Sequence, residues 1–325
     1  MTTDLVLRNA VAAAVMAPSS HNTQPWRFRI AGDALELHAD PKRQLLVIDR
    51  DCRQLVESCG CALMNARVAI RAMGHEEHLT VIPPGPDLPV HLATVRLGAA
   101  REPTALDREL MHAIPRRGTN RRSFLARPVP EPVIDELRAL TTREGAELAR
   151  LDPGQKAALA TLVEEADTRQ FSSGMFREEL MSWLSPPGSR RRDGIPFEEK
   201  EYGSPRAFAL AKIMRSPMLG ELFGTLEESL VRGSPAVVVL GTERDDPAAW
   251  LACGQALEVV LLHATAQGLA ASFLNQVLEL ADLRTRVAKL VPEVGYPQMI
   301  LRIGVPAEPI HRVSPRRDFR DVLDA

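Results

Sequence analysis

Two segments of this chain carry apolar residues at helical spacing and end on glycine. They read "CGCALMNARVAIRAMG", which starts at Cys59, and "CGQALEVVLLHATAQG", which starts at Cys253. Apolar side chains at such spacing line one face of a helix, and glycine often follows the last helical residue. The pattern therefore predicts a long buried helix in each segment.

The two predicted helices match one another without a gap. Identical residues occupy matching places in the pairs Cys59/Cys253, Gly60/Gly254, Ala62/Ala256, Leu63/Leu257, Ala72/Ala266 and Gly74/Gly268, and Asp51 falls on Asp245. Chance similarity between two apolar helices would also explain the match. We interpret it as duplication of an α/β unit, which would give one chain the architecture of a homodimer.

Short strand-like segments accompany both helices. "EEHLTVIP" follows Gly74, "LAASFLNQ" follows Gly268, and "AVVVLG" precedes Asp245. Between the halves, "REPTALDRELMHAI" and "EPVIDELRAL" are predicted helices, each with proline near its start. We expect the first half to span residues 1–102 and the second to span residues 103–325.

Residues 170–206 break the regular pattern with glycine, proline and mixed charge, and the first half has no counterpart. Long irregular insertions often form lids or binding loops, although a disordered surface segment can have the same composition. We therefore expect an irregular insertion at about 170–206 that could cover a bound ligand.

The composition limits the classes of partner. A net charge of −2 gives no reason to expect binding to nucleic acid or to an anionic membrane. No apolar run approaches the roughly 20 residues that span a bilayer. The N-terminal "AVAAAVMA" resembles a short signal-peptide core, but Asp4 argues against the positively charged start of such a peptide. The four cysteines form no C-x-x-C pair and no disulfide framework, which indicates the reducing cytoplasm.

Familiar catalytic motifs are missing from the sequence. It holds no G-x-x-x-x-G-K-[ST], no G-x-G-x-x-G after a strand and no G-x-S-x-G. His75 and His78 lie close together, but two histidines without further ligands make a poor metal site. Classical hydrolase or zinc chemistry therefore has no support in the sequence, and we predict no metal site.

Two polar segments remain as candidates for ligand binding. Residues 17–28 read "APSSHNTQPWRF", and residues 116–122 read "RRGTNRR". Arginine guanidinium groups bind phosphate oxygens through paired hydrogen bonds, and glycine lets the backbone approach a ligand. The composition of the first segment fits a plain turn as well as a ligand-binding loop. The composition of the second segment fits a solvated surface as well as a phosphate-binding site.

Together these segments resemble the FMN-dependent nitroreductase family. Residues 17–28 are similar to its P-S-S-x-N-x-Q-P-W segment, and "RRGTNRRSFLARPVP" is similar to its R-R-S-x-R-x-F…P-V opening, with Thr119 where serine is usual. "YPQMILRIGVP" resembles its closing strand and "PRRDFRDVL" its basic tail. The doubled chain is similar to the Acg-type branch, in which one chain contains two nitroreductase-like halves. The resemblance implies an α+β fold, an α/β sandwich in which helices flank the central antiparallel or mixed sheets of an internally duplicated pseudo-dimer.

The resemblance also implies an FMN site with residues from both halves. Beside the flavin ring it places Pro18, Ser19, Ser20 and Asn22. At the phosphate, ribityl chain and pyrimidine edge it places Arg117, Gly118, Thr119 and Arg121, with Arg316, or alternatively Arg317, adding to phosphate binding. Near flavin N5 it places a backbone amide from the stretch Leu274, Asn275 and Gln276. The adjacent Gln24, Pro25 and Trp26 would then fix the loop.

The chain departs from the family pattern at two places. Asn275 stands where glutamate is typical, and the usual asparagine and lysine at the pyrimidine edge have no clear counterpart, with Arg177 and Ser182 as guesses. Each half carries only one of the two principal motifs. We therefore expect one complete site per chain, between the halves, and a mirror-image site that lacks its arginines.

Three functions remain open from the sequence. The first is an FMN-dependent oxidoreductase that uses NAD(P)H to reduce nitroaromatics, quinones or similar small acceptors. The second is a protein that binds or sequesters FMN under a lid with little turnover, and the third is an interaction module without flavin. An internal pseudo-dimer favours a monomer over a homodimer. No motif in the sequence identifies the physiological acceptor or the choice between NADH and NADPH.

Overall fold

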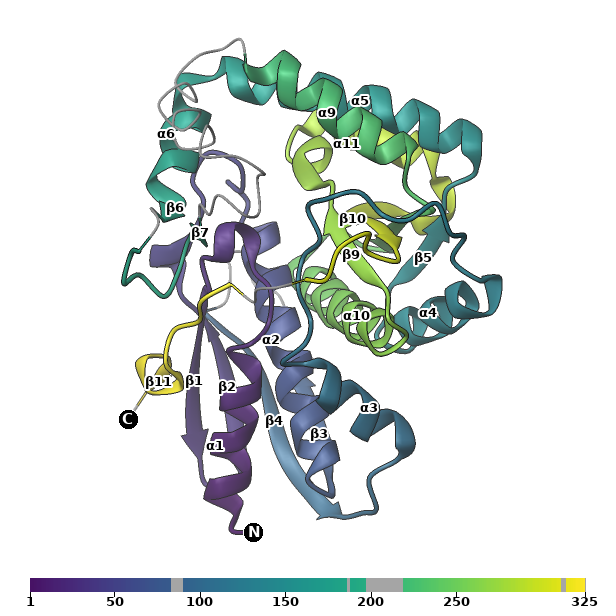
Figure 1. The fold of residues 1–325 in the computed structure, drawn as a ribbon. Helices are drawn as coiled ribbons and strands as arrows, with labels where there is room; N and C mark the ends of the chain where they lie inside the picture. Colours follow the sequence, from purple (N-terminus) through teal and green to yellow (C-terminus); the bar gives the residue numbers. More distant parts are fainter. Residues whose placement is uncertain (83–89, 186–187, 197–218, 311–313, 325) are drawn as a thin grey trace.

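The computed structural model describes residues 1–82, 90–185, 188–196, 219–310 and 314–324. Figure 1 shows two α/β parts that meet along two long helices, α2 (Arg53–Ala72) and α10 (Pro247–Ala266). These helices pack against one another and form the centre of the largest apolar core. They are the two helices that the sequence match predicts.

The first sheet is built from the N-terminal part of the chain and its last residues. Its strand order is β11-β1-β2-β4-β3, and α1 (Thr3–Ala14) and α2 pack on one face. Neighbouring strands are antiparallel, except that β11 lies parallel to β1 and returns the C-terminus to the first half. The strands are β1 (Trp26–Ala31), β2 (Ala34–Ala39), β3 (His75–Val81), β4 (His91–Ala100) and β11 (Leu323–Asp324).

The second sheet is antiparallel throughout, with the order β5-β8-β10-β9. Helices cover both faces, which explains why β8 is buried at every position and reads as a continuous apolar run. The strands are β5 (Glu147–Arg150), β8 (Ala236–Thr242), β9 (Ala270–Phe273) and β10 (Tyr296–Gly304). One face carries α10 and α4 (Glu131–Arg143), and the other carries α5 (Pro153–Ser172), α9 (Leu219–Arg232) and α11 (Ala281–Leu290).

Mixed and antiparallel sheets flanked by helices confirm the expected α+β fold class. The predicted strands after Gly74 and Gly268 are β3 and β9. The predicted helix after Pro103 is α3 (Ala105–Ala113), where Thr104 and Asp107 form a reciprocal capping box. The duplication of one unit and the boundary between residues 102 and 103 stay predictions.

The prediction of irregular structure throughout the insertion at 170–206 is wrong for its first part. Helix α5 continues to Ser172, and α6 (Gly174–Trp183) follows at once, because the Ser173 side chain caps it by accepting from Phe176 N–H. Phe171 and Phe176 then pack edge to face with ring centroids 5.3 Å apart. Short strands β6 (Leu184–Ser185) and β7 (Ile195–Pro196) follow, while residues 186–187 and 197–206 lie outside the described residues.

Two glycines set the distance between the central helices. A Cβ built on Gly60 would lie 2.9 Å from Gly254 Cα, and one built on Gly254 would lie 2.9 Å from Glu57 Cα. Real Cβ atoms do not approach so closely in packed interiors, so the crossing requires glycine on both helices. The matched pair Gly60/Gly254 is therefore the point of closest approach.

Helix α10 is the buried helix that its apolar pattern predicts. Within the described residues it is long and apolar enough to cross a membrane, by length and composition alone. However, 78% of its apolar window is buried inside the fold. It is the core helix of the second half.

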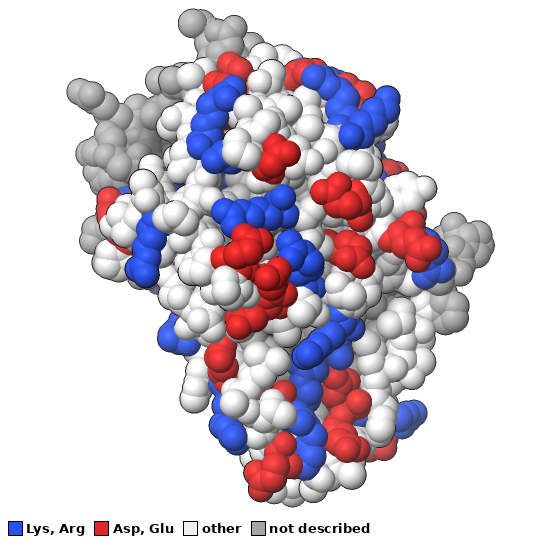
Figure 2. All heavy atoms as spheres, turned by 90° about the vertical axis from the view of Figure 1, so that its right-hand side faces the viewer, with Lys and Arg blue, Asp and Glu red and all other residues white. Residues whose placement is uncertain are grey.

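Charge is mixed on the face at the right-hand side of Figure 1. Figure 2 shows Lys and Arg interspersed with Asp and Glu on that face. The nearly balanced total, 40 basic and 42 acidic residues, agrees with this distribution. Over the described residues, this face therefore presents no broad basic area of the kind that binds nucleic acid.

Buried charge also crosses the interface between the halves. The Arg53 guanidinium on α2 donates to the Leu278 and Gln298 carbonyl oxygens of the second half, at 3.1 and 2.8 Å. It also pairs with Glu57, whose side chain is fully buried. Burial raises the pKa of Glu57 to about 8.

We expect Gly254→Ala to lower the free energy of unfolding by about 1–3 kcal/mol, because the added methyl group overlaps the backbone of α2. The control is Gly174→Ala, since a Cβ there lies 3.9 Å from its nearest atom. It should change stability by less than about 0.5 kcal/mol. Urea denaturation measures both, and equal stability of the two variants would contradict the crossing.

Glu57→Gln should change how stability depends on pH. The carboxyl ionises near pH 4.5 when exposed but near pH 8 in the fold, so the folded chain binds more protons between these values. Its contribution to stability is therefore present at low pH and lost as pH rises, by up to about 1.4 kcal/mol per pH unit. Urea unfolding at several pH values should show that the free energy of unfolding falls less for the variant than for the wild type as pH rises toward 8. A constant difference would show that Glu57 titrates normally.

Candidate functional site

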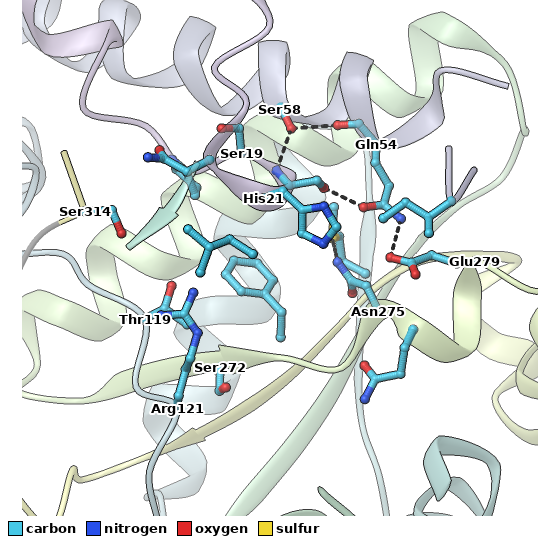
Figure 3. Close-up of a pocket in the computed structure, with 18 of the residues that line it drawn as sticks. Ser19, His21, Gln54, Ser58, Thr119, Arg121, Ser272, Asn275, Glu279 and Ser314 are labelled. Carbon is cyan, nitrogen blue, oxygen red and sulfur yellow. Dashed lines mark hydrogen bonds between the residues drawn. The ribbon is translucent and has the colours of Figure 1, made fainter. Parts of the chain in front are cut away.

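A cavity of about 350 Å³ lies between the two parts of the chain, in the size range of small-molecule sites (Figure 3). The polar loop of residues 17–25 and the start of α2 form one side. The arginine segment of residues 117–121, strand β9 and residues 275–279 form another. Helices α5, α6, α9 and α10, strands β7 and β10 and the C-terminal tail contribute to the remaining wall.

The structure brings most of the predicted residues into this cavity. The residues that line it are Pro18, Ser19, Ser20, Asn22, Arg117, Gly118, Thr119, Arg121, Asn275, Gln276 and Arg316. They come from the polar loop, the arginine segment, the residues after β9 and the tail. The two predicted motifs, far apart in the sequence, therefore face one space.

Two predicted residues do not line the cavity. Leu274 is fully buried in the core of the second sheet, and its N–H donates to the Ile300 carbonyl at 2.9 Å. Arg317 is occupied elsewhere, because its guanidinium donates to Asp321 O at 2.9 Å and its N–H donates to Gln24 Oε1 at 2.8 Å. Arg316 is thus the tail arginine at the cavity.

Arg177 and Ser182, the candidates for the pyrimidine edge, also lie outside the cavity lining. Arg177 donates to the Phe171 carbonyl, and the Ser182 hydroxyl donates to the Glu179 carbonyl. Neither side chain lines the cavity. The insertion instead contributes Gln170, Phe176 and the pair Ile195 and Pro196.

The polar loop has an unusual backbone that its neighbours stabilise. His21, Asn22 and Gln24 have φ of 48°, 55° and 52°, in the left-handed region that side chains disfavour. The Ser19 hydroxyl accepts from Gln24 N–H at 2.9 Å. The Gln24 amide donates to Arg192 O at 2.7 Å, which joins the loop to the insertion. Gln24 thus fixes the loop as expected.

Asn22 joins the loop to the insertion and the tail. Its side-chain amide donates to Gly194 O at 2.9 Å and to Pro315 O at 3.0 Å. Its Oδ1 accepts from Arg316 Nη1 at 3.1 Å. Asn22 therefore positions Arg316 through direct contact, in addition to lining the cavity.

Two arginines approach one another at the basic end of the cavity. Arg117 and Arg316 both donate to the Met16 carbonyl, at 3.0 and 3.2 Å. Arg117 Nε lies 3.7 Å from Oε1 of the fully buried Glu258. Burial and the adjacent Arg117 lower the pKa of Arg316 to about 9. Among the described residues, Nε of each arginine has no hydrogen-bond acceptor. This donor set suits an anion with several oxygens.

The arginine segment runs beside β9. Asn120 N–H donates to Ala271 O at 2.9 Å, and Thr119 forms a bridge with the same residue. Figure 3 shows Thr119 and Arg121 on the same side of the cavity as Ser272. Pairing with the strand fixes the segment, so its side chains are presented from a rigid backbone.

His21 is a cavity residue that the sequence did not single out. It occupies the unspecified position of the P-S-S-x-N pattern. Figure 3 shows its ring between the loop and Asn275. Burial and Arg121 lower the pKa of His21 to about 4, so the ring is neutral at neutral pH. Its Nδ1 has no partner among the described residues.

A chain of hydrogen bonds crosses the cavity wall from one half to the other. The Ser20 hydroxyl donates to Gln54 Oε1, and Gln54 Nε2 donates to Glu279 Oε1 at 2.9 Å (Figure 3). Gln170 donates to the other Glu279 oxygen at 2.6 Å. Burial raises the pKa of Glu279, and burial raises that of the nearby Asp167 to about 7. This end of the cavity therefore holds two carboxyl groups whose charged forms are disfavoured by burial.

Sequence reasoning missed these acidic and amide residues because they lie outside any motif, on helices or, for Glu279, directly after the 3₁₀ helix Asn275–Leu278. One signal was present, because the polar residues Gln54 and Ser58 stand four positions apart on one face of the buried helix α2. Polar residues at that spacing on an apolar helix indicate a hydrated or ligand-facing strip.

Known proteins resemble this chain over almost its whole length. The candidate NAD(P)H nitroreductase Rv3131 of Mycobacterium tuberculosis (strain ATCC 25618 / H37Rv) is 34% identical over 322 residues, which cover 98% of this chain and 91% of that protein. The candidate NAD(P)H nitroreductase Acg of the same strain is 30% identical over 333 residues, which cover 99% and 96%. No protein-family model matches the chain.

Among solved structures, the FMN-dependent nitroreductase NfnB from Mycobacterium smegmatis, in complex with NADPH, is similar with a TM-score of 0.45 and 18% identity. The match covers 68% of this chain and 99% of that chain. The sequence identity to Rv3131 and Acg extends through both halves and confirms the resemblance that the motifs carry. The chain therefore belongs to the nitroreductase family, in the Acg-type branch.

Proposed function

We propose that this protein binds FMN in the cavity and uses NAD(P)H to reduce a small-molecule acceptor such as a nitroaromatic or a quinone. The observation that supports the proposal most is the meeting of the polar loop and the arginine segment around one cavity. Bound FMN would supply the redox chemistry, taking a hydride at N5 and passing two electrons to the acceptor. The chain's own residues would bind and orient the reactants.

The basic end of the cavity fits the FMN phosphate. Arg117 and Arg316 both line the cavity and are fixed by shared contacts to Met16 O. A phosphate would accept from their guanidinium groups and would offset the burial and the repulsion from Arg117 that lower the pKa of Arg316. The Thr119 hydroxyl and Arg121 add donors on the adjacent wall.

The opposite side of the cavity offers donors suited to a flat polar ring. Since the Ser19 hydroxyl oxygen already accepts from Gln24 N–H, its own hydrogen can donate into the cavity. Gln276 lies near the start of the 3₁₀ helix Asn275–Leu278, where N–H groups lack acceptors within the helix. With Leu274 N–H bonded to β10, we assign the amide near flavin N5 to Asn275 or Gln276.

The site needs no partner subunit, because both motifs belong to one chain. The tail reinforces this, since Arg316 reaches the cavity while β11 pairs with β1 of the first half. We therefore propose a monomer with one complete site, in which two halves of one chain replace the two subunits of a dimer.

A second candidate function is storage or sequestration of FMN. It is supported by the insertion, because Phe176, Ile195 and Pro196 line the cavity and Gly194 N–H donates to Asn22 O at 3.2 Å. An anchored insertion of this kind would restrict access of NAD(P)H to the ring. The two functions differ in whether NAD(P)H reduces the bound flavin.

We expect the purified protein to be yellow, with a visible flavin band that bleaches on anaerobic addition of NADPH or NADH and returns when a quinone or nitroaromatic is added. Absorbance spectroscopy measures each step. A flavin band that dithionite bleaches but neither nicotinamide cofactor bleaches would select the storage function. A colourless protein that gains no thermal stability from added FMN would contradict both.

Arg117→Ala and Arg316→Ala should each weaken FMN binding at least about tenfold, because a hydrogen bond to a charged group contributes about 1.5–3 kcal/mol. Fluorescence titration of FMN measures the affinity, and circular dichroism checks the fold. The matched control is Arg116→Ala, because Arg116 is exposed and donates to His112 O at 3.0 Å. Unchanged affinity in both cavity variants would overturn the phosphate assignment.

A further inference from the structure

We propose a transition-metal site on the outer face of the first sheet, in which Glu36, His38 and His91 bind a divalent ion such as Zn²⁺. In the described part of the chain, one ligand atom from each of these side chains lies within 4.8 Å of the others. Two imidazoles and one carboxylate are ligands that Zn²⁺ prefers. The site lies outside the cavity, so the proposal does not depend on FMN.

The register of β2 and β4 brings the three side chains together. Leu35, Leu37 and Ala39 of β2 are buried toward α2, so Glu36 and His38 project from the opposite face. Between Leu37 and His38 the pairing with β4 shifts, and His38 comes directly opposite His91. Regular pairing would place a different residue there, so the irregularity creates the histidine pair.

The distances suit a metal ion. The rings of His38 and His91 stack with centroids 4.6 Å apart, and His38 Nε2 lies 3.0 Å from Glu36 Oε2. A tetrahedral ion with bonds of about 2.0 Å holds its ligand atoms about 3.3 Å apart. The His38–Glu36 separation is already close to that value, so an ion can replace the proton between these two side chains. The His91 ring, which stacks on His38, must turn out of the stack for its lone pair to reach the same ion.

His91 is oriented by its own strand. Its Nε2 lies 3.0 Å from Thr94 Oγ1 and 3.1 Å from Ala93 O. When Nε2 carries the proton and donates to these oxygens, Nδ1 carries the lone pair that a metal needs. In metal sites, a hydrogen bond from the ring nitrogen that does not bind the metal commonly fixes the orientation of a ligand histidine.

Arg29 is the natural competitor for the carboxylate. It donates to both Glu36 oxygens, at 2.8 and 2.9 Å. The Arg29 charge also opposes a cation beside it, so removing Arg29 should strengthen metal binding.

Calorimetric titration of the full chain, without a histidine tag, with Zn²⁺ at about pH 7.5 tests the site. We expect one ion per chain and a rise in melting temperature on Zn²⁺ binding. His38→Ala and His91→Ala should each weaken the affinity at least about tenfold. The matched control is His78→Ala, an exposed histidine on β3 of the same sheet, which should bind Zn²⁺ as the wild type does.

Arg29→Ala keeps the test decisive if a histidine variant unfolds, because the Arg29 side chain is exposed and lies outside the core. It should tighten Zn²⁺ binding several-fold. Three results would each overturn the proposal: a wild-type chain that binds no Zn²⁺ at about 1 mM, unchanged affinity in both histidine variants, and affinity in Arg29→Ala equal to or weaker than that of the wild type.

Discussion

The close crossing of α2 and α10 at Gly60 and Gly254 is the constraint on which the rest of this structure depends. The absence of side chains at these positions lets backbone meet backbone, so each helix packs its sheet against one side of a shared core. The start of α2 then faces the residues after β9, and the interval between them is the cavity. A wider separation of the helices would also pull Arg53 away from its acceptors in the second half.

Each segment of the site depends on another segment for its conformation. The polar loop needs the insertion and the tail to hold its left-handed residues, and the tail needs Asn22 to place Arg316. The arginine segment takes its geometry from β9. This dependence explains how segments that are far apart in one chain come to line a single cavity.

Much of this arrangement can be predicted from the sequence, and the limits have physical causes. The ungapped helix match predicts α2 and α10 together with their glycines, and the motifs predict the loop and the arginine segment. Helix α6 was missed because glycine and proline nearby suggest a break, whereas a single cap at Ser173 starts a helix. Asp167 and Glu279 were missed because periodicity identifies a buried face but not the polar residues that meet a cavity. The pairing of His38 with His91 depends on a register shift that no local pattern encodes.

The central claim is that one chain assembles one flavin site from its two halves. The most direct measurement is the FMN content per chain at saturation, combined with the mass of the loaded particle in solution by light scattering. The account predicts one FMN bound per particle of about 35.7 kDa, the mass of a single chain. Two FMN molecules per chain, or binding that occurs only in a particle of twice that mass, would contradict it.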